Sequence, residues 1–416
     1  MRYLFGLMCV CALGVVPLVG CGEAAPECEV PADCPGDLCT VPGQEDCVGG
    51  VCTYEPVVCS DYNECTTDAC DPAVGCGVAV ADGTACAGGT CQAGVCELTG
   101  SVLPCSEQGI RNAIAAGGDE PYTFDCGGPT TVVVEHTIAI DNNVILDGEG
   151  NLTLDGNDEW VVFELLREDV TAELRGFTVT RGGVWNPNIE GWVGGSIDNV
   201  GTLTLTNTSV SDNIIGIENG GTLTLTNSTV SGNENAYGIG NNGALTLTNS
   251  TVSGNVTEDD TGIFIYGGTV TLLNSTVSDN IYVQTRDDDE PSRSATIVTA
   301  ATLIDGACSQ QGEVTWTSNG YNIESPGNTC GFDQPTDRPE TTAAELNLGA
   351  LADNGGPTLT HLPGGGDFGD GSVAIDKIPE ADCGVTEDQR GEPRPVVIVR
   401  PEQCDVGSVE VQPEDL

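Results

Sequence analysis

Basic residues are scarce in this sequence. Its 416 residues include only 12 Lys and Arg against 63 Asp and Glu, which gives a formal net charge of −51. Nucleic acids and anionic membrane surfaces repel such a chain, and this excludes both as direct partners. Because 39% of the residues are hydrophobic and regularly patterned, the acidity does not indicate disorder. A chain of this charge can also attract divalent cations such as calcium diffusely.

Long apolar runs are rare, and the prominent one lies at the N-terminus. It is too short and too early for a stable membrane span and is typical of a secretory signal, expected over residues 1–20. Its end, "LVGC", resembles the bacterial lipobox. That resemblance implies lipid attachment at Cys21, a lipid-anchored linker over residues 21–27, and a surface-exposed outer-membrane lipoprotein of the bacterial envelope.

Metal-binding spacings are missing among the 21 cysteines. Twelve cysteines fall between Cys28 and Cys96 without a C-x-x-C pair or a His, so disulfides are favoured over zinc in a module expected over residues 28–98. Their connectivity does not follow from the sequence. Asp61, Asn63 and Asp68 could hold calcium, but turn formation is the favoured reading. Six further cysteines form three close pairs: Cys105/Cys126, Cys308/Cys330 and Cys383/Cys404.

The stretch "CTTDACDPAVGC" within this module resembles short cysteine repeats of slime-mould and myxobacterial secreted proteins. Beyond the module, "SEQGIRNAIAAGG" predicts a helix. Ser106 is an N-cap candidate, Ile110, Ala113 and Ile114 form one apolar stripe, and Gly117 ends the pattern. This helix is expected to cap the domain that follows.

One thirteen-residue motif occurs four times, at 201–213, 221–233, 243–255 and 268–280. In "GTLTLTN" the leucines alternate with threonines, so one face is apolar and the other polar. Short strands that repeat every 20 to 25 residues predict a parallel β-helix, expected over residues 99–375. Like residues would then stack: Leu205, Leu225, Leu247, Leu272; Val210, Val230, Val252, Val277; Ile217, Ile239, Ile263; Asn207, Asn227, Asn249, Asn274; and Asn213, Asn233, Asn255, Asn280.

An insertion between coils, "VWNPNIEGWVGG", carries Trp185 and Trp192. Insertions in solenoids become surface loops and are often the binding flank, so these two residues are a candidate binding loop. Open ends of a β-helix need covering, and residues 376–416 are expected to form a disulfide-tied C-terminal cap and tail.

The C-terminal segments "LADNGGPTLTHLPGG", "TEDQRGEPRP" and "CDVGSVE", with "GGSIDNVGTLTLTNTSVSDN" before them, resemble the signature of choice-of-anchor Q domain proteins. The repeat itself is similar to those of polymorphic outer-membrane proteins. The resemblance covers roughly residues 100–410. It implies an all-β, right-handed parallel β-helix displayed on a bacterial surface, and it implies no activity.

Catalytic candidates are few, because residues 201–280 contain no Lys, Arg or His. A polysaccharide lyase would use a basic residue beside calcium-binding carboxylates, and the candidate cluster is Arg175 and Arg181 near Asp147, Asp155, Asp158 and Asp198. Two alternatives remain open. The favoured one is a non-enzymatic surface lipoprotein, without cofactor or bound metal, for adhesion to a glycan or protein. The other is a carbohydrate-active β-helix that uses Arg175, Arg181 and Asp155.

Overall fold

The structure is a computed structural model that describes residues 46–48, 51–53, 60–70, 76–186, 191–256, 260–285, 293–364, 371–396 and 403–415. The signal peptide expected over residues 1–20, the expected lipid attachment at Cys21 and the expected linker 21–27 lie outside these residues. The chain forms two compact units, Met1–Asp61 with Thr66–Ala79, and Tyr62–Cys65 with Val80–Leu416. In the described part of the chain, no helix has the length and apolar character to cross a membrane. The domain bounds expected from the sequence stay predictions.

The smaller unit contains two short antiparallel pairs. Strand β1 (Asp46–Val48) pairs with β2 (Val51–Thr53), and β3 (Thr66–Thr67) pairs with β4 (Val78–Ala79). Strands this short bury little apolar surface, so cross-links rather than a core must stabilise such a module.

The larger unit begins with a disulfide-linked antiparallel sheet of β5 (Ala85–Cys86), β6 (Gly89–Gln92) and β7 (Val95–Leu98). Disulfides join Cys65 to Cys91 and Cys86 to Cys96. The sulfur atoms of Cys65, Cys86 and Cys96 lie within 4.8 Å of one another, but each is already in a disulfide. Their proximity therefore reflects two adjacent cross-links and not a metal site.

A capping helix follows, as the sequence predicts. Helix α1 (Glu107–Ala116) starts at Ser106, whose hydroxyl accepts a hydrogen bond from the Gly109 amide at 3.1 Å. Its apolar stripe is buried against the first coil. Strands β8 (Val102–Pro104) and β9 (Pro121–Asp125) flank the helix, and the Cys105–Cys126 disulfide joins their ends.

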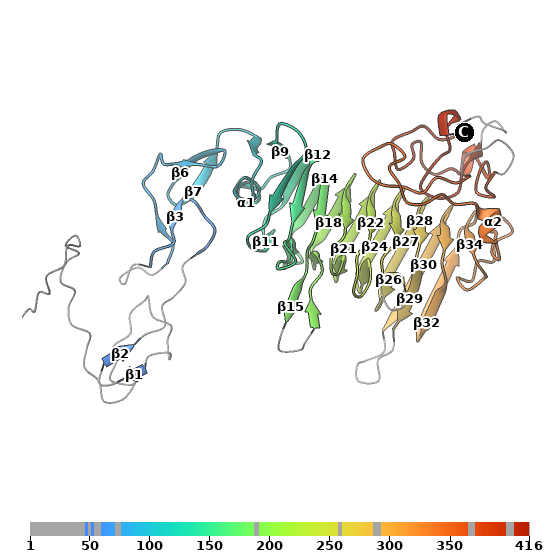
Figure 1. Ribbon diagram of the computed structural model, residues 1–416, viewed down its shortest axis with the longest axis horizontal. Coiled ribbons are helices and arrows are strands. Elements are labelled where there is room, and N and C mark those ends of the chain that lie inside the picture. The colour runs from blue at the N-terminus through green and yellow to red at the C-terminus, as the bar shows by residue number, and fades with distance from the viewer. Residues whose placement is uncertain are drawn as a thin grey trace, which may run out of the picture. The chain divides into compact units, whose positions relative to one another are not determined.

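The rest of the unit is a right-handed parallel β-helix with three strands in each regular coil, which confirms the predicted fold class (Figure 1). The first face consists of β18 (Thr202–Thr206), β21 (Thr222–Thr226), β24 (Ala244–Thr248), β27 (Gly268–Leu273), β30 (Ser294–Ala300) and β33 (Glu313–Ser318). The second face consists of β19 (Ser209–Ser211), β22 (Thr229–Ser231), β25 (Thr251–Ser253), β28 (Thr276–Ser278), β31 (Leu303–Asp305) and β34 (Ile323–Ser325).

Two long strands, β12 (Val144–Asp155) and β14 (Thr171–Thr180), run through both of these faces in the early coils, and β10 (Thr130–Val133) pairs with the end of β12. The third face is an eight-stranded sheet. Its strands are β11 (Ile138–Ala139), β13 (Phe163–Leu165), β17 (Ile197–Asn199), β20 (Ile217–Asn219), β23 (Ile239–Asn241), β26 (Thr261–Ile265), β29 (Asn280–Gln284) and β32 (Cys308–Gln311).

Aliphatic columns fill the interior. Leu205, Leu225, Leu247 and Leu272 are register partners in successive strands, and each is fully buried. The predicted valine and isoleucine columns are register partners in the same way. A single coil could not bury these side chains, so the stacking of coils supplies the hydrophobic stabilisation.

Asparagines recur at two bends of the coil, and only the second set forms a side-chain ladder; in the first set, Asn249 and Asn274 donate to backbone oxygens of the C-terminal region instead. Asn207, Asn227, Asn249 and Asn274 have φ between 46° and 52°, the left-handed conformation that Asn tolerates. In the second predicted ladder, each Nδ2 donates to the next Oδ1, from Asn213 to Asn233 at 2.9 Å and on to Asn255 at 2.8 Å. The last member was predicted wrongly. Asn255 donates to Asp279 at 2.7 Å, because Asp279 and not Asn280 follows in this column.

The C-terminal region extends along the second face as well as over its end (Figure 1). Its residues form hydrogen bonds with the outward-facing hydroxyl groups of β22, β25 and β28. The hydroxyl-bearing residues and their partners are Thr229 with the backbone oxygen of Leu359, Thr251 with Gln389, Ser253 with His361, and Thr276 with Ser408. Two buried ion pairs, Arg390–Asp388 and Arg394–Glu410, stabilise this segment internally. The second face is therefore covered by the chain's own residues over β22, β25 and β28.

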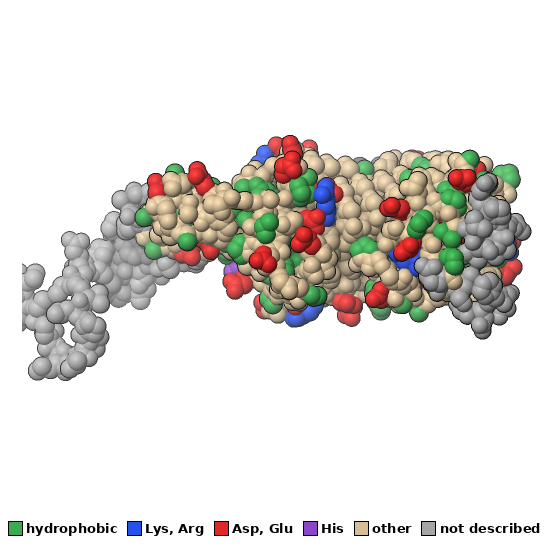
Figure 2. Space-filling view, turned by 90° about the horizontal axis from the view of Figure 1, so that it is seen from above, with side chains coloured by type: hydrophobic (Ala, Val, Ile, Leu, Met, Phe, Trp, Pro, Cys, Tyr) green, Lys and Arg blue, Asp and Glu red, His purple; other side chains and the backbone are tan. Residues whose placement is uncertain are grey.

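This region holds α2 (Ala343–Leu346), β35 (Ile378–Pro379), β36 (Gln403–Cys404) and the single-turn helices η2 (Glu380–Asp382) and η3 (Pro413–Asp415). The close cysteine pairs of the sequence are disulfides here, Cys383–Cys404 in this region and Cys308–Cys330 in the last coils. Figure 2 shows acidic side chains spread over one side of the molecule with few basic ones among them, as the charge of −51 requires.

Candidate functional site

The middle residue of each short strand on the third face points outward, and these residues form one column. In register order the column reads Glu164, Asp198, Glu218, Gly240, Phe264 and Tyr282. Three carboxylates in successive coils are thus followed, after a glycine, by two aromatic rings. Adjacent members are about 4.8 Å apart at the backbone, because that is the spacing of paired strands.

A hollow of about 480 Å³, here called the acidic–aromatic groove, lies over this column. Its lining includes Glu164, Asp198, Glu218, Asn199, Tyr266 and Arg293. The hairpin of β15 (Val184–Asn186) and β16 (Gly191–Val193) ends just before Gly194, which also lines the groove. Figure 1 shows this hairpin projecting on the side of the β-helix where β26, β29 and β32 lie. The insertion therefore flanks the groove.

Asp198 is the central carboxylate of the three. One of its oxygens accepts a hydrogen bond from the Gly195 amide at 2.7 Å. Burial and the neighbouring carboxylates of Glu218 and Glu164 raise the pKa of Asp198 to about 6. A carboxyl group with this pKa changes its protonation state within the mildly acidic range.

Glu218 is held by a chain of phenols. Tyr266 Oη donates to Tyr237 Oη at 3.1 Å, and Tyr237 Oη donates to Glu218 Oε1. Burial raises the pKa of Glu218, and the hydrogen bond from Tyr237 opposes that shift by favouring the ionised form. The arrangement depends on Gly240, because a Cβ at that position would lie 2.5 Å from Cε2 of Tyr237.

Four aromatic rings pack together beside the carboxylates, and one of them, Tyr266, lines the groove. The ring centroids of Phe264 and Tyr266 lie 4.5 Å apart, those of Phe264 and Tyr282 5.1 Å, and those of Tyr237 and Phe264 5.5 Å. Tyr237 is buried, whereas Phe264, Tyr266 and Tyr282 are half-buried and keep part of their surface in solvent. Partly exposed rings beside polar groups are typical of ligand sites.

Two polar groups complete the lining. Arg293 Nη1 donates to Asn242 Oδ1 at 3.4 Å and brings a positive charge to the far side of the groove. Asn199 begins another asparagine ladder, with Nδ2 donating to Asn219 Oδ1 at 2.8 Å. Asn199 is 1% exposed, and its Oδ1 has no hydrogen-bond partner among the described residues. The inner ladder thus starts, next to the groove, with a buried acceptor whose hydrogen-bonding capacity is unused.

The predicted lyase residues lie elsewhere. Arg181, at a bend, pairs with Asp155 at 3.0 Å and Asp158 at 3.1 Å. Arg175, in β14, pairs with Glu173 at 2.7 Å. The bond to Asp158 raises the pKa of Arg181, and the bond to Glu173 raises the pKa of Arg175, so each guanidinium holds its proton more tightly and is less available as a general base. The structure thus gives each arginine its own acidic partners, and their catalytic role stays a prediction.

Trp185 and Trp192 are backbone partners in the β15–β16 hairpin. Their side chains lie outside the described residues, so their role in binding stays a prediction. Of the acids that the sequence grouped with the two arginines, Asp147 is a strand partner of Arg175. Asp198 instead belongs to the acidic–aromatic groove on the third face.

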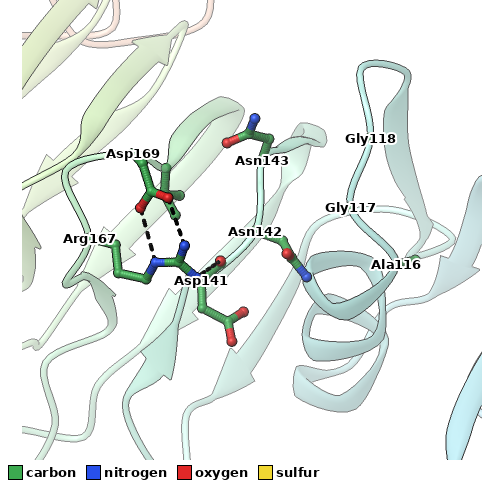
Figure 3. Close-up of a pocket in the computed structure, with 9 residues that line it drawn as sticks. Ala116, Gly117, Gly118, Asp141, Asn142, Asn143, Arg167 and Asp169 are labelled. Carbon is green, nitrogen blue, oxygen red and sulfur yellow. Dashed lines mark hydrogen bonds and ion pairs between the residues drawn. The ribbon is translucent and has the colours of Figure 1, made fainter.

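A second hollow, beside the end of α1, is a weaker candidate. It is lined by Asn142, Asn143, Arg167 and Asp169 among others (Figure 3). Arg167 makes two bonds to Asp169, at 3.0 and 2.7 Å, and a third to the backbone oxygen of Asp141 at 3.4 Å. Arg167 and Asp169 therefore form an ion pair with each other at the surface.

Sequence reasoning missed Glu164, Glu218, Tyr237 and Tyr266. A signal was present for Glu218, since "SIDN", "GIEN" and "GIGN" occupy the same position in successive coils. In an alignment of coils, the variable middle residue of these segments marks an outward column. Glu164, in "FEL", and the two tyrosines, at or near bends, have no counterpart in the repeat.

No protein-family model and no curated protein matches this chain. A search of solved structures finds a similarity to the crystal structure of pectate lyase Pel9A. That match has 14% sequence identity and a TM-score of 0.37, and it covers 72% of this chain and 90% of the other. At this level of similarity it carries no information about activity.

Proposed function

We propose that this protein is a bacterial surface lipoprotein whose β-helix binds carbohydrate chains in the acidic–aromatic groove. The observation that carries the proposal is the hollow on the third face, where three carboxylates of one column and the ring of Tyr266 line the same surface, and Phe264 and Tyr282 continue that column beyond the hollow. Carboxylates accept hydrogen bonds from sugar hydroxyls, and aromatic rings pack against the apolar faces of sugar rings. The proposed anchoring rests on the lipobox-like residues before Cys21.

The charge of the groove restricts the kind of carbohydrate. Three carboxylates face one arginine in its lining, and the whole chain carries a net charge of −51. A polyuronate would be repelled by this field, whereas neutral sugars and sugars with an ammonium group would not. The groove therefore favours uncharged or amino-sugar chains, and a lyase that acts on acidic polysaccharides fits it poorly.

A surface role is consistent with the rest of the molecule. The C-terminal segment covers the second face, the first face carries mainly threonines, and neither face brings together acids and rings as the third face does. The groove is thus the surface on which a ligand would find both hydrogen-bond acceptors and ring platforms. Adhesion to glycans of another cell or of the envelope would follow from display of this groove.

The proposal is tested by measuring binding of soluble oligosaccharides to the full-length protein. The probes are pentasaccharides of cellulose, xylan, mannan and chitosan, together with polygalacturonate in the presence and absence of calcium. Tyr266→Ala removes one ring of the groove and is expected to weaken binding at least about tenfold, or about 1.4 kcal/mol. Thr224→Ala, on the first face, is the control and should leave the affinity unchanged. Binding only of polygalacturonate, or equal affinity in Tyr266→Ala, would contradict the proposal.

A further inference from the structure

Two carboxylates of the groove extend from adjacent strands, side by side on the same face. Asp198 and Glu218 are register partners in adjacent strands of the third face, and both line the groove. Their backbones are therefore about 4.8 Å apart. Enzymes that hydrolyse glycosidic bonds with retained configuration place two carboxyl groups about 5–5.5 Å apart on either side of the bond.

Other groups in the groove point to a ligand independently of the acids. Asn199 is almost completely buried, lines the groove and leaves its Oδ1 without a partner among the described residues. Tyr266 lines the same hollow and packs against Phe264, which continues the column of carboxylates. A buried unused acceptor and a ring platform beside the acids are features of a sugar subsite.

We infer that the groove also hydrolyses glycosidic bonds of the carbohydrate that it binds, with Asp198 as the general acid and Glu218 as the nucleophile. This inference rests on the proposed function. It adds hydrolysis to the binding role, because the third face places Asp198 and Glu218, one coil apart in the chain, in adjacent strands. Tyr237 is a positioning residue, since its phenol bonds Glu218 and its ring occupies the space that Gly240 leaves.

The reaction consumes one water molecule for each bond. Protonated Asp198 gives its proton to the glycosidic oxygen while a Glu218 oxygen attacks the anomeric carbon, so the carbon–oxygen bond of the glycoside breaks and a glycosyl ester forms. Asp198, now ionised, takes a proton from water as the water oxygen attacks the same carbon. The ester bond breaks, Glu218 leaves as a carboxylate, and the anomeric configuration is retained.

The groups around Asp198 are consistent with these roles. Glu164 from β13 and Glu218 from β20 face it, Tyr237 and Tyr266 stand behind Glu218, and Arg293 lines the opposite side. Burial and the two acids raise the pKa of Asp198 to about 6, which keeps a proton available in mildly acidic solution. Burial raises the pKa of Glu218, and the Tyr237 hydrogen bond opposes this shift in favour of the ionised form that a nucleophile requires.

The experiment follows both affinity and turnover of the pentasaccharides that bind, with the full-length protein between pH 4 and 7. Products are identified by mass spectrometry, and the first anomer formed is identified by proton NMR. Asp198→Asn and Glu218→Gln are each expected to lower turnover by about 100-fold or more, while affinity changes less than about threefold. Glu173→Gln, the same chemical change on the first face, is the control and should keep the wild-type rate.

Tyr237→Phe tests whether Tyr237 positions Glu218 for the reaction or only stabilises the fold. Loss of the hydrogen bond should raise the pKa of Glu218, so the acidic limb of the rate profile should move to higher pH. Bound pentasaccharides that the wild type leaves intact across this range would overturn the inference and leave the proposed binding in place. An inverted product, or full turnover by Asp198→Asn, would also overturn it. Absence of binding by every pentasaccharide would overturn the proposed function itself.

Discussion

The first and third faces of the β-helix belong to the same coils but present different chemistry. On the first face the outward residue hardly changes, since Thr204, Thr224, Thr246 and Thr271 are register partners. On the third face the equivalent column changes in every coil, from Asp198 to Glu218, Gly240 and Phe264. The inner residues of both faces are uniform aliphatic or asparagine columns.

The difference separates the residues that build the scaffold from those that build the site. A solenoid is stabilised by like residues stacked in neighbouring coils, so repetition at a position indicates a structural role. A position that varies between coils is free of that requirement and can carry chemistry. The groove lies over the variable column of the third face. The β15–β16 hairpin ends beside the groove, and Arg293 lines it.

The largest difference in the free energy of unfolding should appear between substitutions of an inner and an outer residue of the same strand. Leu247→Ala removes a fully buried member of the leucine column and should lower the free energy of unfolding by about 2–5 kcal/mol. Thr246→Ala, its outward neighbour in β24, should change it by less than about 1 kcal/mol. Urea unfolding followed by circular dichroism measures both. Equal effects would show that the columns do not carry the stability.

A smaller effect on stability, and one that depends on pH, is expected from substitution of the carboxylate at the centre of the groove. The pKa of Asp198 is raised from 3.8 to about 6, so the folded state holds its proton more tightly than the unfolded chain. Its contribution to stability is therefore lost as the pH rises from about 4 to about 6. Asp198→Asn should remove this loss and stabilise the protein near pH 7 by about 1 kcal/mol, allowing for partial exposure.

The measurement is the difference in unfolding free energy between wild type and Asp198→Asn at several pH values. Asp119→Asn, the same chemical change at an exposed position outside the groove, is the control. A difference of the opposite sign, with Asp198→Asn less stable near pH 7, would mean that the groove stabilises the ionised carboxylate.

The smallest effects should come from the arginines that the sequence singled out. Arg175 and Arg181 are partly exposed and pair with acids at the surface. Arg175→Ala and Arg181→Ala should each change the free energy of unfolding by less than about 1 kcal/mol and leave oligosaccharide binding unaltered. Isothermal titration and urea unfolding measure the two quantities. Loss of binding or of turnover in either variant would mean that the functional site lies in the early coils and not in the groove.

The sequence predicts the scaffold well because its determinants repeat at short range. Leucine, valine and asparagine columns follow from residues that recur about one coil apart, and the cap helix follows from Ser106 and its apolar stripe. One error, Asn280 in place of Asp279, arose where the repeat ends and the chemistry of the ladder changes from amide to carboxylate. Local patterns are sufficient for this part of the fold.

The groove and the C-terminal segment could not be predicted in the same way. Glu164 and Glu218 are unlike each other in local sequence, and only the register of the third face brings them into one column. The C-terminal segment reaches the second face through side-chain contacts such as Ser253 with His361, 108 residues apart, and Gln389 with Thr229, 160 residues apart. Pairings of this kind depend on tertiary packing that no local pattern records.

The most direct test of this account is a crystal structure of the Glu218→Gln variant with a bound pentasaccharide. The substitution is chosen so that the pentasaccharide is not hydrolysed. We expect sugar density between Asp198 and Tyr266 on the third face, with a ring packed against an aromatic side chain. Density on the threonine-rich first face or beside Arg181, with the groove left unfilled, would contradict the central claim.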